Sequence, residues 1–210
     1  MTSSLPLSPS SSSSRLSPSV EVEVEGARTD RAGKPPSASC AAMVYKIFPN
    51  DLNSDGTVFG GVILSLMDRT ALVVAERHSG KSCVTVSIDA VRFVAPGRKG
   101  ENIVCTATIT RSWTSSMEIA LTLKAEQPFS GDQRLIVEAY FTFCAFDPWG
   151  RPTRTPVPTV LPQTDQEHHQ YDEAEIRRTE RLRATQSRKE RQHSKQQRRK
   201  QEQRVLHSKL

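Results

Sequence analysis

The apolar and polar positions divide the chain into a middle part that can bury a core and two ends that cannot. Between residues 40 and 158, several segments are rich in β-branched and aromatic residues and show partial alternation, as in Val84, Val86 and Ile88. Such alternation is typical of strands with one buried face. We therefore expect five strands, over residues 40–48, 82–93, 103–113, 117–125 and 135–146.

Residues 60–78 have a different pattern, because apolar side chains occupy nearly every face of the helix that they predict. Ser79 and Gly80 follow as a typical helix end. A helix of this kind must be enclosed by other elements. The order of one strand, one long helix and a run of strands indicates an α+β fold. We expect a domain over residues 40–158 in which a curved antiparallel β-sheet wraps around one long central helix.

The two ends differ from this domain in composition. Residues 1–39 are rich in Ser and Pro, with ten Ser in the first 19 residues, and we expect this segment to be disordered. Residues 159–210 form a polar tail that is helical only in part, over residues 171–183. Residues 181–210 hold 11 Lys and Arg against 2 Asp and Glu, so the net charge of +6 belongs to the tail.

Several functional classes lack their usual signals. No apolar run approaches the ~18 residues that a membrane-spanning helix needs. The four cysteines show no CxxC pair and no Cys/His spacing, so we expect reduced thiols and no metal site. Residues 51–56 resemble the first half of a calcium loop, but Val62 stands where its last carboxylate should be. His78 is the one histidine of the domain and is expected to face solvent.

Asp68 is a carboxylate in the middle of the predicted helix. Its helix neighbours three and four residues away carry no positive charge: Leu64, Ser65, Ala71 and Leu72. Such a carboxylate either reaches water or lies in a cleft, where it can act as a base or a nucleophile. An ion pair with Arg69 or with a distant strand is the alternative.

Gly60 and Gly61 stand at the start of the same helix. A helix N-terminus presents unpaired N–H groups and partial positive charge. Two glycines would let a substrate carbonyl approach this backbone closely, as in an oxyanion hole. The alternative is that they only permit a tight entry from the loop into the helix, and the two interpretations are compatible.

Three features of this segment occur together: Asn53 and Gly56 in the loop, the run Phe59-Gly60-Gly61, and an apolar helix with Met67-Asp68. This combination resembles the acyl-CoA thioesterases of the hotdog fold, in particular their bacterial and cytosolic branch. Shorter similarities follow at residues 84–89, 113–119 and 143–152, so that the resemblance covers about residues 44–156.

The resemblance implies specific roles. Asp68 would be the catalytic carboxylate, as general base for water or as nucleophile. Asn53 would orient the water or the thioester carbonyl, and the backbone N–H of Gly60 or Gly61 would polarise that carbonyl. No metal and no cofactor are implied, since coenzyme A is part of the substrate.

The spacing of these residues adds a prediction about assembly. Gly60 and Asp68 are eight residues apart, which is about 12 Å along a helix axis, so one thioester carbon cannot contact both. We therefore expect a homodimer with shared active sites, in which one chain supplies Asn53 and Gly60 and the other supplies Asp68. The resemblance points the same way, often as a trimer of dimers.

Coenzyme A carries several phosphate charges, which the domain must bind with local groups. We name as candidates Arg92, Arg98 and Lys99 around a Pro/Gly turn, and the turn formed by Thr114, Ser115 and Ser116. The alternative for each of them is an ordinary solvated loop residue.

The sequence thus predicts an acyl-CoA thioesterase that hydrolyses acyl-CoA to free acid and CoA. Two alternatives stay open: a hotdog protein that binds acyl-CoA without hydrolysing it, and a nucleic-acid-binding protein that acts through its basic tail. The tail has no interleaved aromatic residues to stack on bases, which favours a solvated arm. We expect a cytoplasmic protein, or a peroxisomal one in a eukaryote, because the chain ends in Ser208-Lys209-Leu210.

Overall fold

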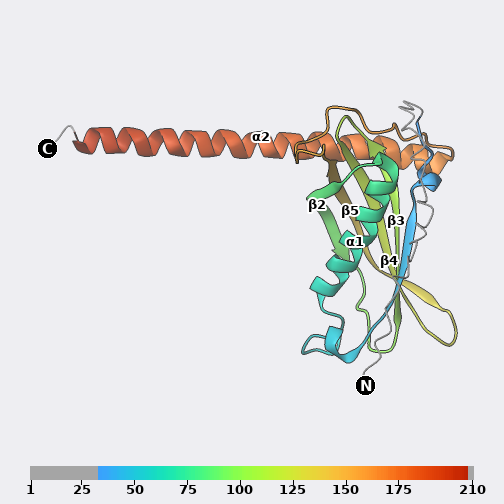
Figure 1. The fold of residues 1–210 in the computed structure, drawn as a ribbon. Helices are drawn as coiled ribbons and strands as arrows, with labels where there is room; N and C mark the ends of the chain where they lie inside the picture. Colours follow the sequence, from blue (N-terminus) through green and yellow to red (C-terminus); the bar gives the residue numbers. More distant parts are fainter. Residues whose placement is uncertain (1–32, 208–210) are drawn as a thin grey trace, which may run out of the picture.

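The computed structural model describes residues 33–207. Five strands and two long helices make up this part of the chain (Figure 1). In chain order they are β1 (Ala41–Lys46), α1 (Gly60–Ser79), β2 (Cys83–Phe93), β3 (Asn102–Ser112), β4 (Ser116–Glu126), β5 (Gln133–Ala145) and α2 (Asp165–His207), with short 3-10 turns at Pro36–Ala38 and Pro49–Asp51. The predicted α+β class, the five strands and the first helix are confirmed, with ends displaced by at most two residues.

The strands form one antiparallel sheet in the order β1-β3-β4-β5-β2. The two strands that flank α1 in sequence, β1 and β2, are therefore the two edges of the sheet. α1 connects one edge to the other and lies across one face of the sheet (Figure 1). Gly80 ends α1 in the left-handed conformation, with φ of 65° and its N–H bonded to the carbonyl of Glu76, as a glycine cap does.

The core lies between α1 and this face of the sheet. Alternate residues of β3, β4 and β5 are buried in register with one another, as in the row Ile109, Ile119 and Phe141. The buried side chains of α1 recur every three or four residues, as at Ile63, Met67 and Val74, so they line one side of the helix. The sheet therefore covers one side of α1, and the expected enclosure all round is not found, because Ser65, Arg69 and Val73 on the other side are exposed.

Two expectations at the C-terminal end of α1 were wrong. His78 does not face solvent but is fully buried, with Nδ1 3.0 Å from Ser39 Oγ and Nε2 2.8 Å from the carbonyl oxygen of Pro158. The segment before residue 40 covers it, and Lys34 pairs with Val160 there. Residues 33–39 are thus part of the domain, although they were assigned to a disordered segment; residues 1–32 lie outside the described residues.

The helix in the tail is much longer than the predicted residues 171–183. α2 begins directly after Thr164, which caps the helix. The Thr164 hydroxyl oxygen accepts the N–H of Glu167, and the Glu167 carboxylate accepts the N–H of Thr164. This reciprocal pair of bonds is a capping box. The helix then crosses the sheet and continues far beyond it (Figure 1). The expected solvated arm is therefore helical up to His207, and the last three residues lie outside the described part.

α2 lies on the face of the sheet opposite α1. Glu118 and Tyr140 alternate along their strands with the core residues Ile119 and Phe141, and so point to the other face. α2 contacts this outer face from β3, where Arg111 pairs with Glu175 of the helix, to the edge strand β2, where Asp89 pairs with Arg181. Neither helix of the described chain is long and apolar enough to cross a bilayer.

Candidate active site

Asp68 lies halfway along α1, where the helix passes the edge strand β2. Its side chain is half-buried, and its Oδ1 accepts a hydrogen bond from Thr85 Oγ1. Among the side chains that the structure describes within residues 33–197, no Lys, Arg or His lies close enough to form an ion pair with this carboxylate. The alternative of an ion pair with Arg69 or with a strand cation is therefore not what this chain forms. The second carboxylate oxygen remains available.

Thr85 is a site residue that the sequence analysis missed. Thr85 pairs in register with the core residue Phe143, so its side chain points toward α1 rather than to the outer face. A register shift between Thr85 and Ser87 interrupts the ladder next to it. The available signal was a polar residue at a helix-facing position of a strand, but that facing depends on which strands pair.

Asn53 organises the loop that leads into α1. Its Oδ1 accepts the N–H groups of Asp55 and Thr57 at 3.0 and 3.1 Å, and its Nδ2 lies 3.0 Å from Thr57 Oγ1. This is the way an Asn side chain closes a turn on its own backbone. Asn53 is nevertheless exposed, so it stands at the surface beside the start of the helix.

Asp51, which the calcium-like pattern contained, has a structural role. Its carboxylate is buried and accepts the Tyr45 hydroxyl at 2.9 Å and the N–H of Phe48 at 2.8 Å. The hydrogen bond from Tyr45 to Asp51 raises the pKa of the tyrosine. Among the described residues no group of three or more His, Cys, Asp and Glu is arranged to bind a metal ion.

Gly60 and Gly61 are the first two residues of α1 and directly follow the N-cap residue Phe59. No backbone carbonyl within residues 33–207 accepts their N–H groups, whereas the N–H of Val62 already bonds to Phe59. A Cβ at Gly61 would lie 2.5 Å from Cε1 of the exposed Phe59 ring, so a larger residue there would require this ring to move. The glycine pair thus forms a tight entry into the helix, and its two amide N–H groups have no backbone acceptor.

The candidates for CoA binding separate into two groups. Arg98 and Lys99 are exposed on the turn next to the Asn53 loop, where Thr57 pairs with Arg98, and Arg92 is exposed near the same end of β2. Thr114, Ser115 and Ser116 lie at the opposite end of the sheet, where the Ser115 carbonyl accepts the N–H of Ala145. A single chain does not bring the two groups together.

Comparison with known proteins places this geometry in a family. Residues 55–129 match the model of the thioesterase superfamily. An acyl-CoA thioester hydrolase of Bacillus subtilis is 35% identical over 136 residues, which are 65% of this chain and 78% of that protein. An acetyl-coenzyme A thioesterase of mouse is 38% identical over 140 residues, but these are only 25% of the mouse protein, so this chain spans a quarter of its length.

Solved structures agree. A hexameric acyl-CoA thioesterase is 30% identical with a TM-score of 0.70, over 73% of this chain and 97% of that one. The acyl-CoA hydrolase of Staphylococcus aureus, in complex with butyryl-CoA and CoA, is 33% identical with a TM-score of 0.66, over 73% and 95%.

The Staphylococcus aureus enzyme was also solved as three alanine variants, of an asparagine, an aspartate and a threonine that are 15 and 17 residues apart. Asn53, Asp68 and Thr85 have the same two separations. With the antiparallel sheet, the central helix and the Asp68–Thr85 contact, these similarities show that the chain belongs to the acyl-CoA thioester hydrolases of the thioesterase superfamily, which have the hotdog fold.

Proposed function

We propose that this protein hydrolyses the thioester of acyl-CoA to a free acid and CoA, with Asp68 as the catalytic carboxylate. The observation that carries the proposal is the Asp68–Thr85 pair: a half-buried carboxylate on an apolar helix with no cation beside it and one hydroxyl that fixes its orientation. The relatives whose names describe acyl-CoA hydrolysis support the reaction class.

The Thr85 hydroxyl donates to one oxygen of the Asp68 carboxylate. The other oxygen can then accept a proton from water or attack the thioester carbon. As general base, Asp68 takes a proton from water while the water oxygen attacks the thioester carbon; the tetrahedral intermediate then releases the CoA thiolate, which is protonated. As nucleophile, Asp68 attacks the thioester carbon and the C–S bond breaks, which releases the CoA thiolate and leaves a mixed anhydride; water then hydrolyses the anhydride to the free acid and the Asp68 carboxylate. Thr85 is a positioning residue in both cases, because it contacts the substrate only through Asp68.

The free amides of Gly60 and Gly61 are suited to stabilise the oxyanion of the intermediate. They lie about 12 Å along α1 from Asp68 of the same chain, so a second chain must supply them. The edge strand β2 carries a run of exposed apolar side chains, Val84, Val86 and Ile88, which a second copy would cover. Hexameric relatives support an oligomer.

A thiol-release assay with acyl-CoAs of several chain lengths tests the function. Asp68→Asn should lower kcat/KM by about 10²- to 10⁴-fold, the range typical for removal of a general base or acid. Glu76→Gln removes a carboxylate from the exposed side of the same helix and is the matched control, with unchanged turnover expected. CoA binding without turnover in the wild-type protein would instead support an acyl-CoA-binding protein.

Complementation tests whether two chains share the site. Asp68→Asn and Asn53→Ala chains, each inactive alone, are unfolded together and refolded. In a mixed dimer one site receives the intact Asn53 of one chain and the intact Asp68 of the other, so random pairing should restore about a quarter of the wild-type activity. If both residues acted within one chain, no activity would return.

A further inference from the structure

The charges of α2 are separated along the helix, and their sign changes where the helix reaches the edge of the sheet. Residues 165–180 carry six Asp and Glu against two Arg, whereas residues 181–197 carry six Arg and Lys against one Glu. The acidic half lies on the sheet and the basic half projects past it (Figure 1). Arg181, the first residue of the basic half, pairs with Asp89 on the edge strand β2. The basic half therefore begins at this edge and extends beyond it.

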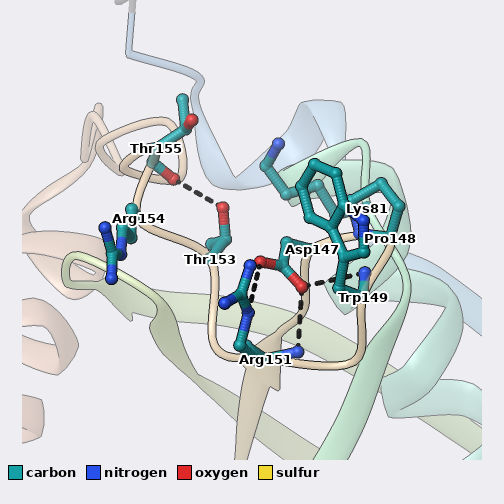
Figure 2. Close-up of a pocket in the computed structure, with 8 residues that line it drawn as sticks. All are labelled: Lys81, Asp147, Pro148, Trp149, Arg151, Thr153, Arg154 and Thr155. Atoms are coloured by element: carbon teal, nitrogen blue, oxygen red, sulfur yellow. Dashed lines mark hydrogen bonds and ion pairs between the residues drawn. The ribbon is translucent and has the colours of Figure 1, made fainter.

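The turn after β5 shows the other arrangement, a surface group of charges that is balanced locally. Asp147 accepts the N–H groups of Trp149 and Arg151 at 3.0 and 2.9 Å, and its side chain lies 3.4 Å from Arg151 Nε (Figure 2). The basic half of α2 cannot be balanced in this way, since Glu190 is its one acidic residue up to position 197. An acidic surface from elsewhere would therefore be attracted to it.

The path of α2 shows what such a surface could belong to. Arg111 on β3 pairs with Glu175, and Asp89 on β2 pairs with Arg181, so the helix runs across the strands toward the edge. From Arg181 it continues for about 39 Å to His207. A five-stranded sheet, with about 4.8 Å between strands, is only about 19 Å wide. A second sheet joined to β2 would therefore lie along the basic half of this helix.

The exposed edge of β2 decides how a second copy would join. Val84, Val86 and Ile88 are exposed there. Antiparallel pairing of this edge with its copy implies a twofold axis perpendicular to the sheet. The axis keeps the outer faces of both sheets on one side, so the two α2 helices run antiparallel above them. Because α2 crosses β2 at Asp89, next to Ile88, the helices lie side by side, with the acidic half of each along the basic half of the other.

The side of α2 that faces the second helix carries Glu175. Its Oε2 accepts the indole N–H of Trp113 at 2.8 Å. The register across the sheet leads from Trp113 to the exposed Val84, by way of Ser116 and Cys144. Glu175 therefore lies on the side of the helix toward the exposed apolar residues of β2. Its other oxygen, Oε1, has no hydrogen bond among the described residues.

Leu182 and Lys189 follow Glu175 at intervals of seven residues, so all three share one face of the helix. Leu182 is 58% exposed, and Lys189 is exposed and forms no ion pair within residues 33–197. In an antiparallel pair of helices centred on Leu182, position 175 of one helix stands opposite position 189 of the other. The two leucines then meet on the twofold axis, and each Glu175 meets a Lys189.

We propose that the α2 helices of two copies pair antiparallel on the outer face of the dimer, with Leu182 at the centre and Glu175 opposite Lys189 of the second copy. The helix pair adds to the contact between the β2 edges. Exposed ion pairs contribute little each, so the β2 edges hold the dimer and turnover does not depend on α2. The inference rests on the dimer of the proposed function and not on its chemistry.

Crosslinking tests whether the two leucine positions meet. Leu182→Cys is made in the full-length chain together with Cys40→Ser, because the other three cysteines are buried. A short bifunctional maleimide should convert most of this variant to covalent dimers. Glu180→Cys, which is also exposed but lies on the opposite side of α2, is the matched control and should give at least fivefold less covalent dimer.

Sedimentation measures the contribution of the charges. Lys189→Glu places like charges opposite each other twice in every dimer, and it should raise the Kd of the dimer about five- to tenfold at low salt. The increase should shrink at about 0.5 M NaCl, where exposed charges are screened. Arg188→Glu makes the same change of charge on another side of the helix and should raise the Kd less than twofold.

Equal crosslinking at positions 180 and 182, or an unchanged dimer Kd in Lys189→Glu, would overturn the inference. An RNA duplex that binds the basic half while position 182 stays without a crosslink would assign this half to nucleic acid instead. The proposed hydrolysis can fail separately. A dimer that crosslinks at Leu182→Cys but releases no thiol contradicts the hydrolase and leaves the helix pair intact, whereas an active dimer without the crosslink does the reverse.

Discussion

The two long helices of this protein are held by opposite means. α1 packs one side against the sheet and is anchored there by buried apolar side chains such as Met67 and Val74. α2 has almost no apolar side chains to bury, and its exposed Ile176 and Leu182 do not change this. It is instead attached to the outer face of the sheet by charged and aromatic contacts. The position of α1 is therefore set by the burial of its apolar side chains, whereas the position of α2 is set by a few charged and aromatic contacts with the sheet.

The attachment of α2 centres on one carboxylate. Glu118 is fully buried and lies 2.8 Å from Arg177 Nη2 and 3.0 Å from Arg181 Nη1, while it also accepts the hydroxyl of Thr110 at 2.9 Å. Arg181 reaches Asp89 on the edge strand at 2.7 Å. The Arg177 guanidinium lies 3.7 Å from the centre of the Tyr140 ring. Such a cluster is specific, but desolvation offsets much of its attraction.

The largest expected difference between the helices is in their response to truncated apolar side chains. Met67→Ala should lower the free energy of unfolding by about 2 to 5 kcal/mol, because it leaves a cavity in a close-packed core. Ile176→Ala on α2 should change it by less than about 0.5 kcal/mol, since the side chain is exposed. Denaturant unfolding at one fixed protein concentration measures both. Equal effects would mean that α2 is also held by burial.

Loss of the buried carboxylate should have the next largest effect. Glu118→Gln should lower the free energy of unfolding by about 1 to 3 kcal/mol, because two half-buried guanidinium groups lose their shared partner. Arg181 retains Asp89 and Arg177 retains Glu173, which limits the loss. The first turns of α2 should also become more accessible to trypsin. Glu180→Gln, at an exposed position of the same helix, serves as the control, and a similar effect there would contradict the central role of Glu118.

The free energy of unfolding should depend on pH through His78 on α1 and not through the histidines on α2. Burial lowers the pKa of His78 below its usual value of 6.5, and the Lys34 ammonium, which donates to the carbonyl of His78 at 3.0 Å, adds to this. The unfolded chain then binds the proton more tightly than the folded protein. The stability that the neutral imidazole contributes is present above pH 6.5 and is lost as the pH falls below it.

This loss can be at most about 1.4 kcal/mol per pH unit. It is measured by urea unfolding between pH 7.5 and 5, where His78→Gln should show a flatter pH profile than the wild type. His168→Gln, on the exposed surface of α2, should leave the profile unchanged. A wild-type slope that persists in His78→Gln would assign the effect to other groups.

The smallest effect is expected from the projecting half of α2. The side chains of residues 184–197 are exposed and make only local hydrogen bonds, such as Gln186 with Glu190. A chain that ends after Arg183 should therefore keep its turnover and lose less than about 0.5 kcal/mol of stability. Light scattering and the thiol-release assay check this. A changed oligomer would show that the basic half contacts a second copy, and salt-dependent RNA binding that only the full chain shows would restore the nucleic-acid hypothesis.

The sequence by itself determined the elements whose patterns are local. Alternation located the five strands, the all-round apolar run located α1, and Gly80 marked its end. It also identified Asp68 as a carboxylate without a charged neighbour on its own helix, and the glycine pair at the helix start. These conclusions hold because strand and helix periodicity and the capping preferences act over a few residues.

Only the tertiary structure decided which distant groups meet. Thr85 became the partner of Asp68 because strand pairing turned it toward α1, and His78 became buried because the segment at Ser39 and the loop at Pro158 fold over it. The path of α2 likewise depends on Glu118, a residue 59 positions before Arg177. Contacts of this kind leave no periodic trace in the sequence, since each depends on the register and order of strands far apart along the chain.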